Sequence, residues 1–222
     1  MITKIRGVIQ REKQKNPKGL ALVLLINRLI KVTGRNVRHF LTRDSTFTSK
    51  DTMPMCSLFP KRALDIVILN IRPQSILDIG CGTGVSLSYF IDNGIDAWGI
   101  ENSALAASNS KNPERILKYN LNKSVDLQKK FDLVWCFEVI EHIHPMFESS
   151  ILKTLTSHGP LVILSAAKPG QGGHGHFNEQ NEEYWIKKFS DLGYVFDEKL
   201  SLNLRETKEE HAENLMVFNA QI

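Results

Sequence analysis

The sequence predicts an α/β fold: a mostly parallel sheet of seven strands with helices on both faces, preceded by a basic helical extension. Two observations lead to this fold class. From residue 54 onward, short apolar segments alternate with segments of helical periodicity, which is typical of strands joined by crossover helices. In addition, "PLVILSAA" (residues 160–167) is continuously apolar, as expected for a strand that is covered on both sides.

Seven segments are expected to be strands, because each is short, apolar and bounded by polar or turn-forming residues. They cover residues 75–80, 95–101, 115–120, 131–137, 160–167, 194–200 and 214–220. No helix is evident between the last two segments. We therefore expect one antiparallel strand at the edge of the sheet.

Helices are expected to connect the strands, because the intervening segments place apolar residues at helical spacing. They cover residues 56–71, 84–94, 103–110, 138 to about 157, and 181–193. Pro60 interrupts the start of the first of these segments. Gly94 and Gly193 close two others, since glycine is the usual residue just after a helix.

Charge is divided unevenly along the chain. Residues 1–43 contain eleven of the 28 lysines and arginines and one acid, Glu12, which gives this part a charge of +10. The remaining residues carry 17 basic and 23 acidic side chains, a charge of −6. We expect two regions with different roles, a basic helical extension with a linker (residues 1–53) and an α/β domain (residues 54–222).

Within the basic region, Gly19–Val32 is strongly apolar and contains two positive charges, Arg28 and Lys31. A helix of this length reaches about 20 Å, which is too short to span a hydrocarbon core of about 30 Å. No transmembrane segment is therefore expected. The segment could lie on an anionic membrane surface, contact RNA phosphates, or pack against protein with its charges in water.

Cysteine usage predicts a cytoplasmic protein, with peripheral membrane contact if the basic region binds lipid. The three cysteines, Cys56, Cys81 and Cys136, are odd in number and match no zinc-binding spacing. Such usage is typical of a reduced compartment.

A loop with three glycines, "LDIGCGTG" (residues 77–84), follows the first expected strand and is called the glycine loop below. Glycines at 80, 82 and 84 permit a sharp turn and let a ligand approach the backbone closely. In parallel sheets, ligands bind at the carboxyl ends of strands. The Gly-x-Gly-x-Gly spacing departs from the Gly-x-Gly-x-x-Gly fingerprint of dinucleotide sites, which argues against a nicotinamide dehydrogenase. Glu101 ends the second strand, where a carboxylate can accept hydrogen bonds from both ribose hydroxyls.

The chain resembles the class I methyltransferases, which use S-adenosylmethionine and have a Rossmann-like fold. The resemblance is carried by "LDIGCGTG", by "GIEN" (residues 99–102) and by "FDLVWCFEVIEHI" (residues 131–143), and it covers roughly residues 70–219. It implies that the glycine loop holds the methionine part of the cofactor, Asp78 its amino group and Glu101 its ribose. Asn120 stands where the family often has an aspartate near the adenine. The implied cofactor-binding residues are Asp78, Gly80, Cys81, Gly82, Gly84, Glu101, Asn102, Asn120 and Phe137.

Acidic and imidazole side chains follow the fourth strand. Glu138, Glu141 and His142 have offsets of three and four, which place them on one face of a helical turn. Such groups repel or compete unless a cation or a proton joins them. One reading is a divalent metal; the other is that one glutamate accepts backbone hydrogen bonds while the remaining two groups are partly solvated.

Glu-x-x-Glu-His with a later histidine resembles the metal site of small-RNA 2′-O-methyltransferases and of some quinone-ring O-methyltransferases. This resemblance implies Mg²⁺ or Mn²⁺ held by Glu138, Glu141, His142 and His176, where the ion would lower the pKa of a hydroxyl. Without a metal, His142 or His176 would act as general base. The candidate catalytic residues are Glu138, His142 and His176.

The loop after the fifth strand, "SAAKPGQGGHGHFNEQ" (residues 165–180), resembles a narrower group of methyltransferase-domain proteins with "SAAxPGQGGxGHxNEQ". His176, Asn178, Glu179 and Gln180 match that pattern, whereas His174 falls on a variable position and is expected to be exposed. The group is often associated with surface-sugar biosynthesis, which implies a carbohydrate acceptor.

Together these features predict methyl transfer from S-adenosylmethionine to a hydroxyl of a sugar or other small molecule. Because the sulfonium is already activated, most of the rate would come from positioning and desolvation. Two alternatives remain: an RNA 2′-O-methyltransferase with a metal-assisted site, and a non-catalytic S-adenosylmethionine-binding module that acts through the basic helix.

Overall fold

The computed structural model describes residues 57–221, which fall within the second of the two units of the chain, residues 45–222. The expectations for residues 1–53, including the basic helix and its contacts with a membrane or RNA, lie outside the described residues. Within residues 57–221 no helix combines the length and the apolar character that a membrane crossing requires.

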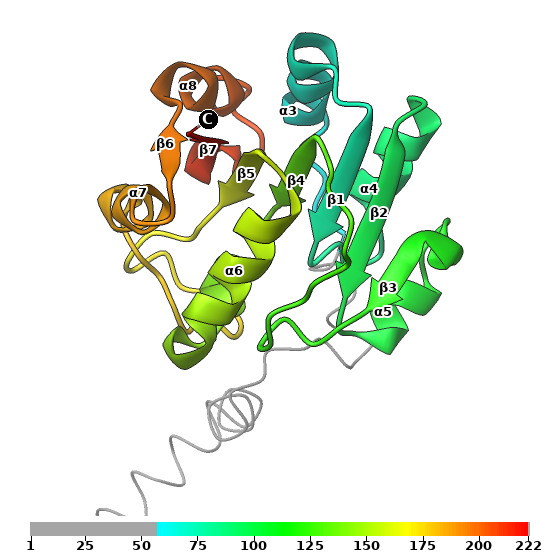
Figure 1. The fold of residues 1–222 in the computed structure, drawn as a ribbon, viewed down its shortest axis with the longest axis horizontal. Coiled ribbons are helices and arrows are strands. Elements are labelled where there is room, and N and C mark those ends of the chain that lie inside the picture. Colours follow the sequence, from blue (N-terminus) through cyan, green and yellow to red (C-terminus); the bar gives the residue numbers. More distant parts are fainter. Residues whose placement is uncertain (1–56, 222) are drawn as a thin grey trace, which may run out of the picture. The chain divides into compact units, whose positions relative to one another are not determined.

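Seven strands form one sheet in the order β3-β2-β1-β4-β5-β7-β6 (Figure 1). The strands are β1 (Ser75–Ile79), β2 (Asp96–Glu101), β3 (Ile116–Lys118), β4 (Leu133–Cys136), β5 (Leu161–Ser165), β6 (Tyr194–Phe196) and β7 (Leu215–Ala220). The pairs from β3 through β5 are all parallel. β7 runs antiparallel to both of its neighbours. The predicted mostly parallel sheet is confirmed.

Helices cover both faces of the sheet, as predicted (Figure 1). Their bounds are α3 (Lys61–Ile66), the π-helical turn η2 (Val67–Ile71), α4 (Val85–Asp92), α5 (Ala104–Ser108), α6 (Glu148–His158), α7 (Glu182–Ser190) and α8 (Glu198–Arg205), with the 3-10 turns η3 (Pro113–Arg115), η4 (Ile140–His142), η5 (Pro145–Phe147) and η6 (Ala212–Asn214). Apolar residues of α3, α4 and α8 form one buried cluster, and those of α6 and α7 form another. The sheet therefore lies between two apolar layers, which is why its central strands are apolar throughout.

The end of the chain differs from the sequence prediction. β6 stops at Phe196, and Asp197 begins helix α8 by accepting a hydrogen bond from the Leu200 amide at 2.9 Å. A side-chain oxygen at this position stabilises a helix start, so "DEKL" begins a helix and does not extend the strand. The expected antiparallel pairing at the edge is confirmed, because the edge strand β6 pairs antiparallel with β7. The strand that runs opposite to the others, β7, lies one position in from the edge.

The segment after β4 is not the continuous helix that was predicted. Glu138 has a left-handed backbone with φ +55°, and two 3-10 turns, η4 and η5, precede α6. Pro145 occupies the first position of η5, where its missing N–H costs nothing, whereas inside a helix it would break a hydrogen bond. Glu138, Glu141 and His142 therefore do not share the face of one α-helix.

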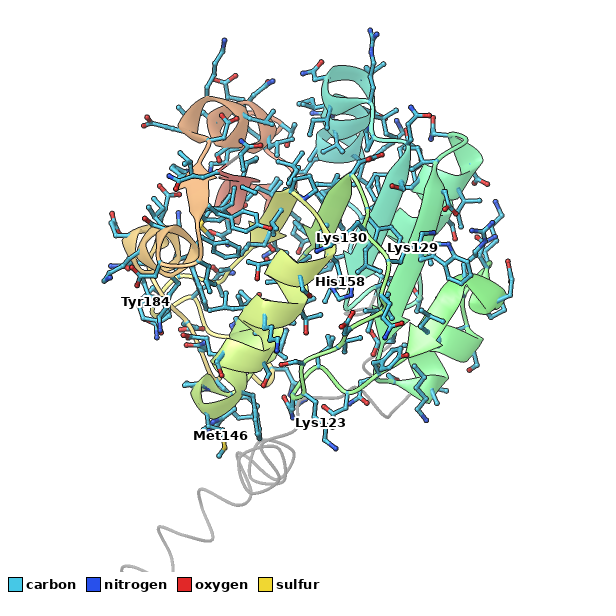
Figure 2. The ribbon with its side chains drawn as sticks, viewed as in Figure 1. Lys123, Lys129, Lys130, Met146, His158 and Tyr184 are labelled. Carbon is cyan, nitrogen blue, oxygen red and sulfur yellow. The ribbon has the colours of Figure 1, made fainter. Side chains whose placement is uncertain are left out.

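Polar groups of α6 that lie on the sheet side are satisfied internally. His158, labelled in Figure 2, is buried, and its Nε2 accepts a hydrogen bond from the Leu127 amide at 3.0 Å. Its Nδ1 lies 2.7 Å from the carbonyl oxygen of Thr154. Both ring nitrogens are therefore used in holding the connection before β4 onto α6, and His158 has a structural role.

Candidate functional site

The glycine loop occupies the carboxyl end of β1, next to β2 and β4. Gly80 has φ +76°, and a Cβ there would lie 2.5 Å from Cγ2 of Val139. Gly84 has φ +72°, and its Cβ would lie 2.6 Å from Oγ of Ser110. Both positions combine a left-handed backbone with close contact, so only glycine fits without strain. The loop is thus packed directly against the residues that follow β4.

Asp78 lies beneath this loop in a position that favours a bound cation. Its side chain is 3% exposed, and its Oδ2 has no hydrogen-bond partner among residues 57–221. Burial raises the pKa of Asp78 to about 8, with a further contribution from the negative charge of Glu101. An ionised carboxylate in such a place is costly unless a positive group joins it. The ammonium of an amino-acid-like ligand would supply that partner.

Glu101, at the end of β2, is hydrogen-bonded to the loop backbone. Its Oε2 accepts from the Gly82 amide at 2.9 Å and its Oε1 accepts from the Ser103 amide at 2.6 Å. Burial raises the pKa of Glu101, although these amide hydrogen bonds oppose the shift. The carboxylate therefore fixes the loop against β2, and each oxygen retains acceptor capacity for a ribose hydroxyl.

The remaining predicted cofactor residues surround the same strand ends. Cys81 is buried behind the loop, and Asn102, directly after Glu101, is half-buried. Asn120 is exposed after β3, and its Oδ1 accepts a hydrogen bond from the Asn122 amide at 2.9 Å. Phe137, directly after β4, stacks on Trp135 with ring centroids 5.8 Å apart. The predicted residues thus follow four neighbouring strands of the parallel part of the sheet.

A second cluster unites part of the predicted metal set. Glu141, His142 and His176 each offer a ligand atom within 4.8 Å of the others. The two imidazole rings lie at 86° to each other with centroids 4.9 Å apart. Glu141 is fully buried, and neither carboxylate oxygen has a hydrogen-bond partner within residues 57–221. Glu138 lies outside this set.

Hydrogen bonds on the outer side orient both imidazoles of the cluster. Nδ1 of His142 lies 3.2 Å from the Gly175 carbonyl oxygen, and Nδ1 of His176 lies 3.0 Å from Oε1 of Glu179. Because carbonyl and carboxylate oxygens only accept, Nδ1 carries the proton in each neutral ring. This arrangement is typical of metal-binding histidines, whose ligand atom is then Nε2.

The carboxyl groups of Asp78, Glu138 and Glu141 gather around Cys136, where β1 and β4 end. Burial raises the pKa of Glu141 well above its usual range, and the neighbouring Glu138 raises it further. The pKa of the Cys136 thiol is raised for similar reasons, by burial first and then by the charges of Glu141, Asp78 and Glu138. Three carboxyl groups therefore contribute to the raised pKa of one buried thiol. A cationic ligand is favoured in such a place, either a metal ion, an ammonium or a sulfonium.

The polar residues of the glycine-rich loop (residues 165–180) hold that loop in shape. Glu179 accepts hydrogen bonds from the Gly170 amide at 2.9 Å and the Gly172 amide at 2.7 Å. Although burial opposes the shift, these bonds and His176 lower the pKa of Glu179. Asn178 is 1% exposed and donates to Oε2 of Glu148 on α6 at 3.0 Å.

The loop is also attached to the cluster directly. The backbone amides of Phe177 and Asn178 both donate to the carbonyl oxygen of Glu141, at 2.8 and 3.0 Å. These hydrogen bonds bring His176 next to His142. The two segments are far apart in the sequence, since His142 and its hydrogen-bond partner Gly175 are separated by 33 positions. His174 is half-buried, whereas the sequence predicted an exposed position.

Two residues near Glu138 were missed by the sequence reasoning. Ser165, at the end of β5, donates to Oε1 of Glu138 at 2.8 Å and accepts from the Glu138 amide at 2.6 Å. His211, in the segment before β7, places Nδ1 3.3 Å from Oε2 of Glu138. Neither has a spacing that relates it to Glu138 along the chain. The only signal for Ser165 was its place as the first residue of the loop motif of residues 165–180.

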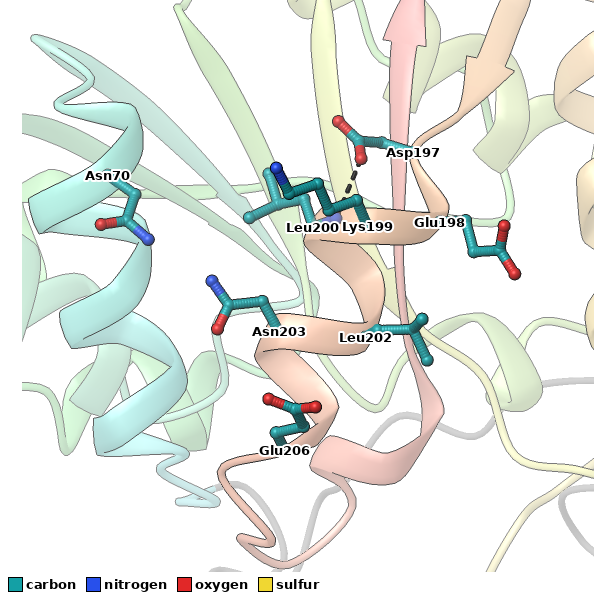
Figure 3. Close-up of a pocket in the computed structure, with 8 residues that line it drawn as sticks. All are labelled: Asn70, Asp197, Glu198, Lys199, Leu200, Leu202, Asn203 and Glu206. Atoms are coloured by element: carbon teal, nitrogen blue, oxygen red, sulfur yellow. Dashed lines mark hydrogen bonds between the residues drawn. The ribbon is translucent and has the colours of Figure 1, made fainter.

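A separate groove between η2 and α8 carries no comparable chemistry (Figure 3). Its lining residues are Asn70, Asp197, Glu198, Lys199, Leu200, Leu202, Asn203 and Glu206. The Asp197 carboxylate is used structurally, since it begins α8 and accepts from Asn219 Nδ2 at 3.2 Å. No buried polar atom without a partner, among those of residues 57–221, belongs to this lining. We therefore assign the functional site to the strand ends.

Three features describe the protein: an α/β sheet, a buried carboxyl group under the glycine loop without a partner among the described residues, and an acid–imidazole cluster beside it. Residues 50–199 match the methyltransferase domain family, and the chain belongs to this family.

Three similar proteins illustrate the range of the family. Norajmaline N-methyltransferase of Rauvolfia serpentina is 27% identical over 132 residues, which is 54% of this chain and 45% of that protein. The dTDP-3-amino-3,6-dideoxy-alpha-D-glucopyranose N,N-dimethyltransferase of Streptomyces fradiae is 35% identical over 75 residues, 32% of this chain and 29% of that protein. Less than half the length of either relative is thus matched.

The third is a solved structure. Magnesium protoporphyrin IX methyltransferase from Synechocystis, with bound SAH, has a TM-score of 0.58 at 13% identity and covers 89% of this chain and 99% of its own. At this identity the likeness concerns the fold.

Proposed function

We propose that the chain transfers a methyl group from S-adenosylmethionine to a hydroxyl of a sugar or other small molecule. The observation that carries this proposal is the cluster of Glu141, His142 and His176 beside the glycine loop. A hydroxyl is a weak nucleophile until its proton is removed or its pKa lowered, and such a cluster can do either. A neutral amine already has a nucleophilic lone pair and has less need of it.

In this proposal Asp78 binds the cofactor's ammonium, and Glu101 binds its ribose while holding the Gly82 amide. The unpartnered Oδ2 of Asp78 supports the first assignment, and the place of Glu101 at the end of β2 supports the second. Phe137 lines the methionine end, and Asn120 lies toward the adenine. Gly80, Cys81, Gly82 and Gly84 form the loop above the cofactor, and Asn102 adjoins the ribose.

The reaction is an in-line displacement. The acceptor oxygen bonds to the methyl carbon while the carbon–sulfur bond breaks, and the electron pair of that bond stays on sulfur. The hydroxyl proton leaves to a base or to water. Burial of the carboxyl groups around Cys136 keeps water from the reacting atoms, and the loop of residues 165–180 positions the acceptor.

Glu141, His142 and His176 are the residues that would hold a divalent ion. One carboxylate and two imidazoles suit Mn²⁺ better than Mg²⁺, which prefers oxygen ligands and retains its waters. When bound, such an ion lowers the pKa of a hydroxyl. The unpartnered oxygens of Glu141 fit this ion. Without it, His142 or His176 accepts the hydroxyl proton, and Glu141 remains protonated in its buried position.

A carbohydrate acceptor is supported by the relative from Streptomyces fradiae, whose printed substrate is a nucleotide-linked amino sugar. The same metal-like cluster favours a second candidate, an RNA 2′-hydroxyl, which would require the basic residues 1–43 as a phosphate-binding extension. The domain boundaries in either case are residues 1–53 and 54–222. A non-catalytic S-adenosylmethionine-binding module would need neither the cluster nor its outer hydrogen bonds.

Methyl transfer from tritiated S-adenosylmethionine tests these possibilities. The acceptor panel contains nucleotide-linked sugars with free hydroxyls, their amino analogues, small phenols and short RNA with 2′-hydroxyls. We expect a labelled methyl ether on a sugar, loss of activity in EDTA, and recovery with Mn²⁺ above that with Mg²⁺. Labelling of amines alone would contradict the hydroxyl assignment.

Variants separate the metal from the base. His176→Ala is expected to lower turnover by about 10²-fold or more, with cofactor affinity unchanged, because the residue faces the acceptor side of the cluster. His174→Ala is the matched control from the same loop and is expected to have little effect. Full activity in excess EDTA would rule out the ion but retain the histidines. Full activity of a His142→Ala, His176→Ala double variant would rule out both roles.

A further inference from the structure

The segment between α8 and β7 is held against the site at two points. The Glu209 carboxylate accepts hydrogen bonds from the first amides of α3, Arg62 N at 2.9 Å and Ala63 N at 3.0 Å. Asn214, which is 3% exposed, donates to Oε1 of Gln171 in the glycine-rich loop at 3.0 Å. The stretch between these anchors therefore lies between α3 and that loop.

His211 lies between the two anchors and faces Glu138. Its Nδ1 is 3.3 Å from Oε2 of Glu138, and its side chain is 28% exposed while that of Glu138 is 8% exposed. Both residues have left-handed backbones, with φ +62° at His211 and +55° at Glu138. This conformation is uncommon for residues other than glycine, and it is concentrated at functional sites. Here it turns the two side chains toward each other.

Glu138 is itself held in one orientation. Ser165 Oγ accepts from the Glu138 amide and donates to Oε1 of the Glu138 carboxylate. Oε2 is then directed at the imidazole of His211. A carboxylate only accepts, so a neutral His211 ring that pairs with Glu138 would carry its proton on Nδ1 and present a lone pair at Nε2. The nearest acidic group to Nε2 is Glu210, whose Oε1 is 3.7 Å away and whose side chain is 79% exposed; a ligand can displace it.

The location of this pair relates it to the reaction. Glu138 precedes Val139, the residue that contacts Gly80 of the cofactor loop. Its charge also acts, with those of Asp78 and Glu141, on the Cys136 thiol. Glu138 therefore lies where the methyl-bearing end of the cofactor is proposed to bind. His211 is the more exposed of the two side chains, so an acceptor can reach its ring more readily than it can reach Glu138.

We infer that His211 is an acceptor-contacting residue, whose Nε2 accepts a hydrogen bond from another hydroxyl of the acceptor, beside the one that is methylated, and that Glu138 and Ser165 are positioning residues that fix the His211 imidazole. The inference rests on the proposed transfer to a hydroxyl. It gives Glu138 a role outside the Glu141–His142–His176 cluster. It also gives a role to the segment of residues 206–214, which joins α8 to β7.

Nitrogen NMR of the full chain tests the geometry without an acceptor. In protein labelled with ¹⁵N-histidine, the neutral His211 ring is expected to be protonated at Nδ1, and assignment follows from His211→Asn. In Glu138→Gln the amide oxygen retains the hydrogen bond from Ser165, so the amide NH₂ faces His211 and donates to Nδ1. The proton is then expected on Nε2. Protonation of the wild-type ring at Nε2, or no change in Glu138→Gln, would overturn the inference.

Steady-state kinetics test the role, with the panel compound of highest turnover as acceptor. His211→Asn retains a residue type that tolerates a left-handed backbone, so folding is preserved. We expect its acceptor kcat/KM to fall about tenfold or more, because one hydrogen bond to the acceptor is lost, while the cofactor Kd stays within about twofold. Glu138→Gln should show a similar loss, and the double variant no further loss, because both act on one contact. Glu210→Gln is the control and is expected to be unchanged.

Two failures can be told apart. Failure of the proposed function appears as no hydroxyl product from the wild-type chain. Failure of this inference appears as unchanged acceptor kcat/KM in His211→Asn, or as additive losses in the double variant.

Discussion

Binding of S-adenosylmethionine is expected to release a proton, because Asp78 must ionise to bind the cofactor's ammonium. In the ligand-free protein the pKa of Asp78 is raised to about 8, by burial and by the charge of Glu101. Below this pH the carboxyl is mostly protonated, and binding selects the minor ionised form. From pH 6 to pH 7 that fraction rises about tenfold, equivalent to about 1.4 kcal/mol of binding free energy. The association constant should rise by the same factor.

The sign is opposite for the stability of the ligand-free protein. Because the folded pKa of Asp78 is raised above the usual value of 3.8, ionisation is more favourable in the unfolded chain. Stability therefore falls as pH rises from about 4 toward 8, and bound cofactor should offset this loss.

Isothermal titration calorimetry with S-adenosylhomocysteine, which also carries the amino group, measures the effect between pH 6 and 7.5. Repeating the titration in buffers of different ionisation enthalpy should show about one proton released at pH 6.5. Asp78→Asn is the control: it should bind more weakly, with little dependence on pH. An affinity that is flat across this range in the wild type, with no proton release, would refute the assignment of Asp78.

Other predictions concern packing, the α6 network and the extension. Gly80→Ala should lower the thermal unfolding midpoint and the cofactor affinity more than Gly94→Ala. Both glycines have left-handed backbones, but only at Gly80 would an added Cβ meet a side chain, that of Val139. Equal effects of the two substitutions would contradict this prediction. Glu148→Gln should reduce the free energy of unfolding by about 1–3 kcal/mol, measured by urea denaturation at pH 7. Although burial raises the Glu148 pKa, hydrogen bonds from Lys188, Asn178 and Tyr184 lower it below 4.5 overall. The difference in unfolding free energy between wild type and Glu148→Gln should therefore vanish as the pH falls through the pKa of Glu148 in the folded protein. Removal of residues 1–53 should leave cofactor affinity within about twofold and reduce salt-sensitive binding to anionic vesicles or RNA; equal binding by both chains at low salt would contradict a role for the extension.

The sequence by itself determined the fold class and the place of the cofactor loop. Continuous apolar segments and helical periodicity are local patterns, and burial on both faces of a parallel sheet requires them. The glycines of residues 80–84 are likewise readable, because glycine is needed wherever a left-handed backbone meets a close neighbour. Glu101 and Asp78 could be selected as candidates because they lie at strand ends, where parallel topology places ligands.

Only the tertiary structure decided what those side chains contact. Whether a carboxyl group such as that of Asp78 or Glu141 lacks a partner depends on which distant segments approach it, and no local pattern contains that information. The left-handed backbones of Glu138 and His211 are not encoded by residue type, and they arise where neighbouring contacts overdetermine the chain. His211 reaches Glu138 because Glu209 and Asn214 anchor its segment to α3 and to the glycine-rich loop. Long-range hydrogen bonds of this kind exist only once the sheet has brought the ends of β4 and β5 together.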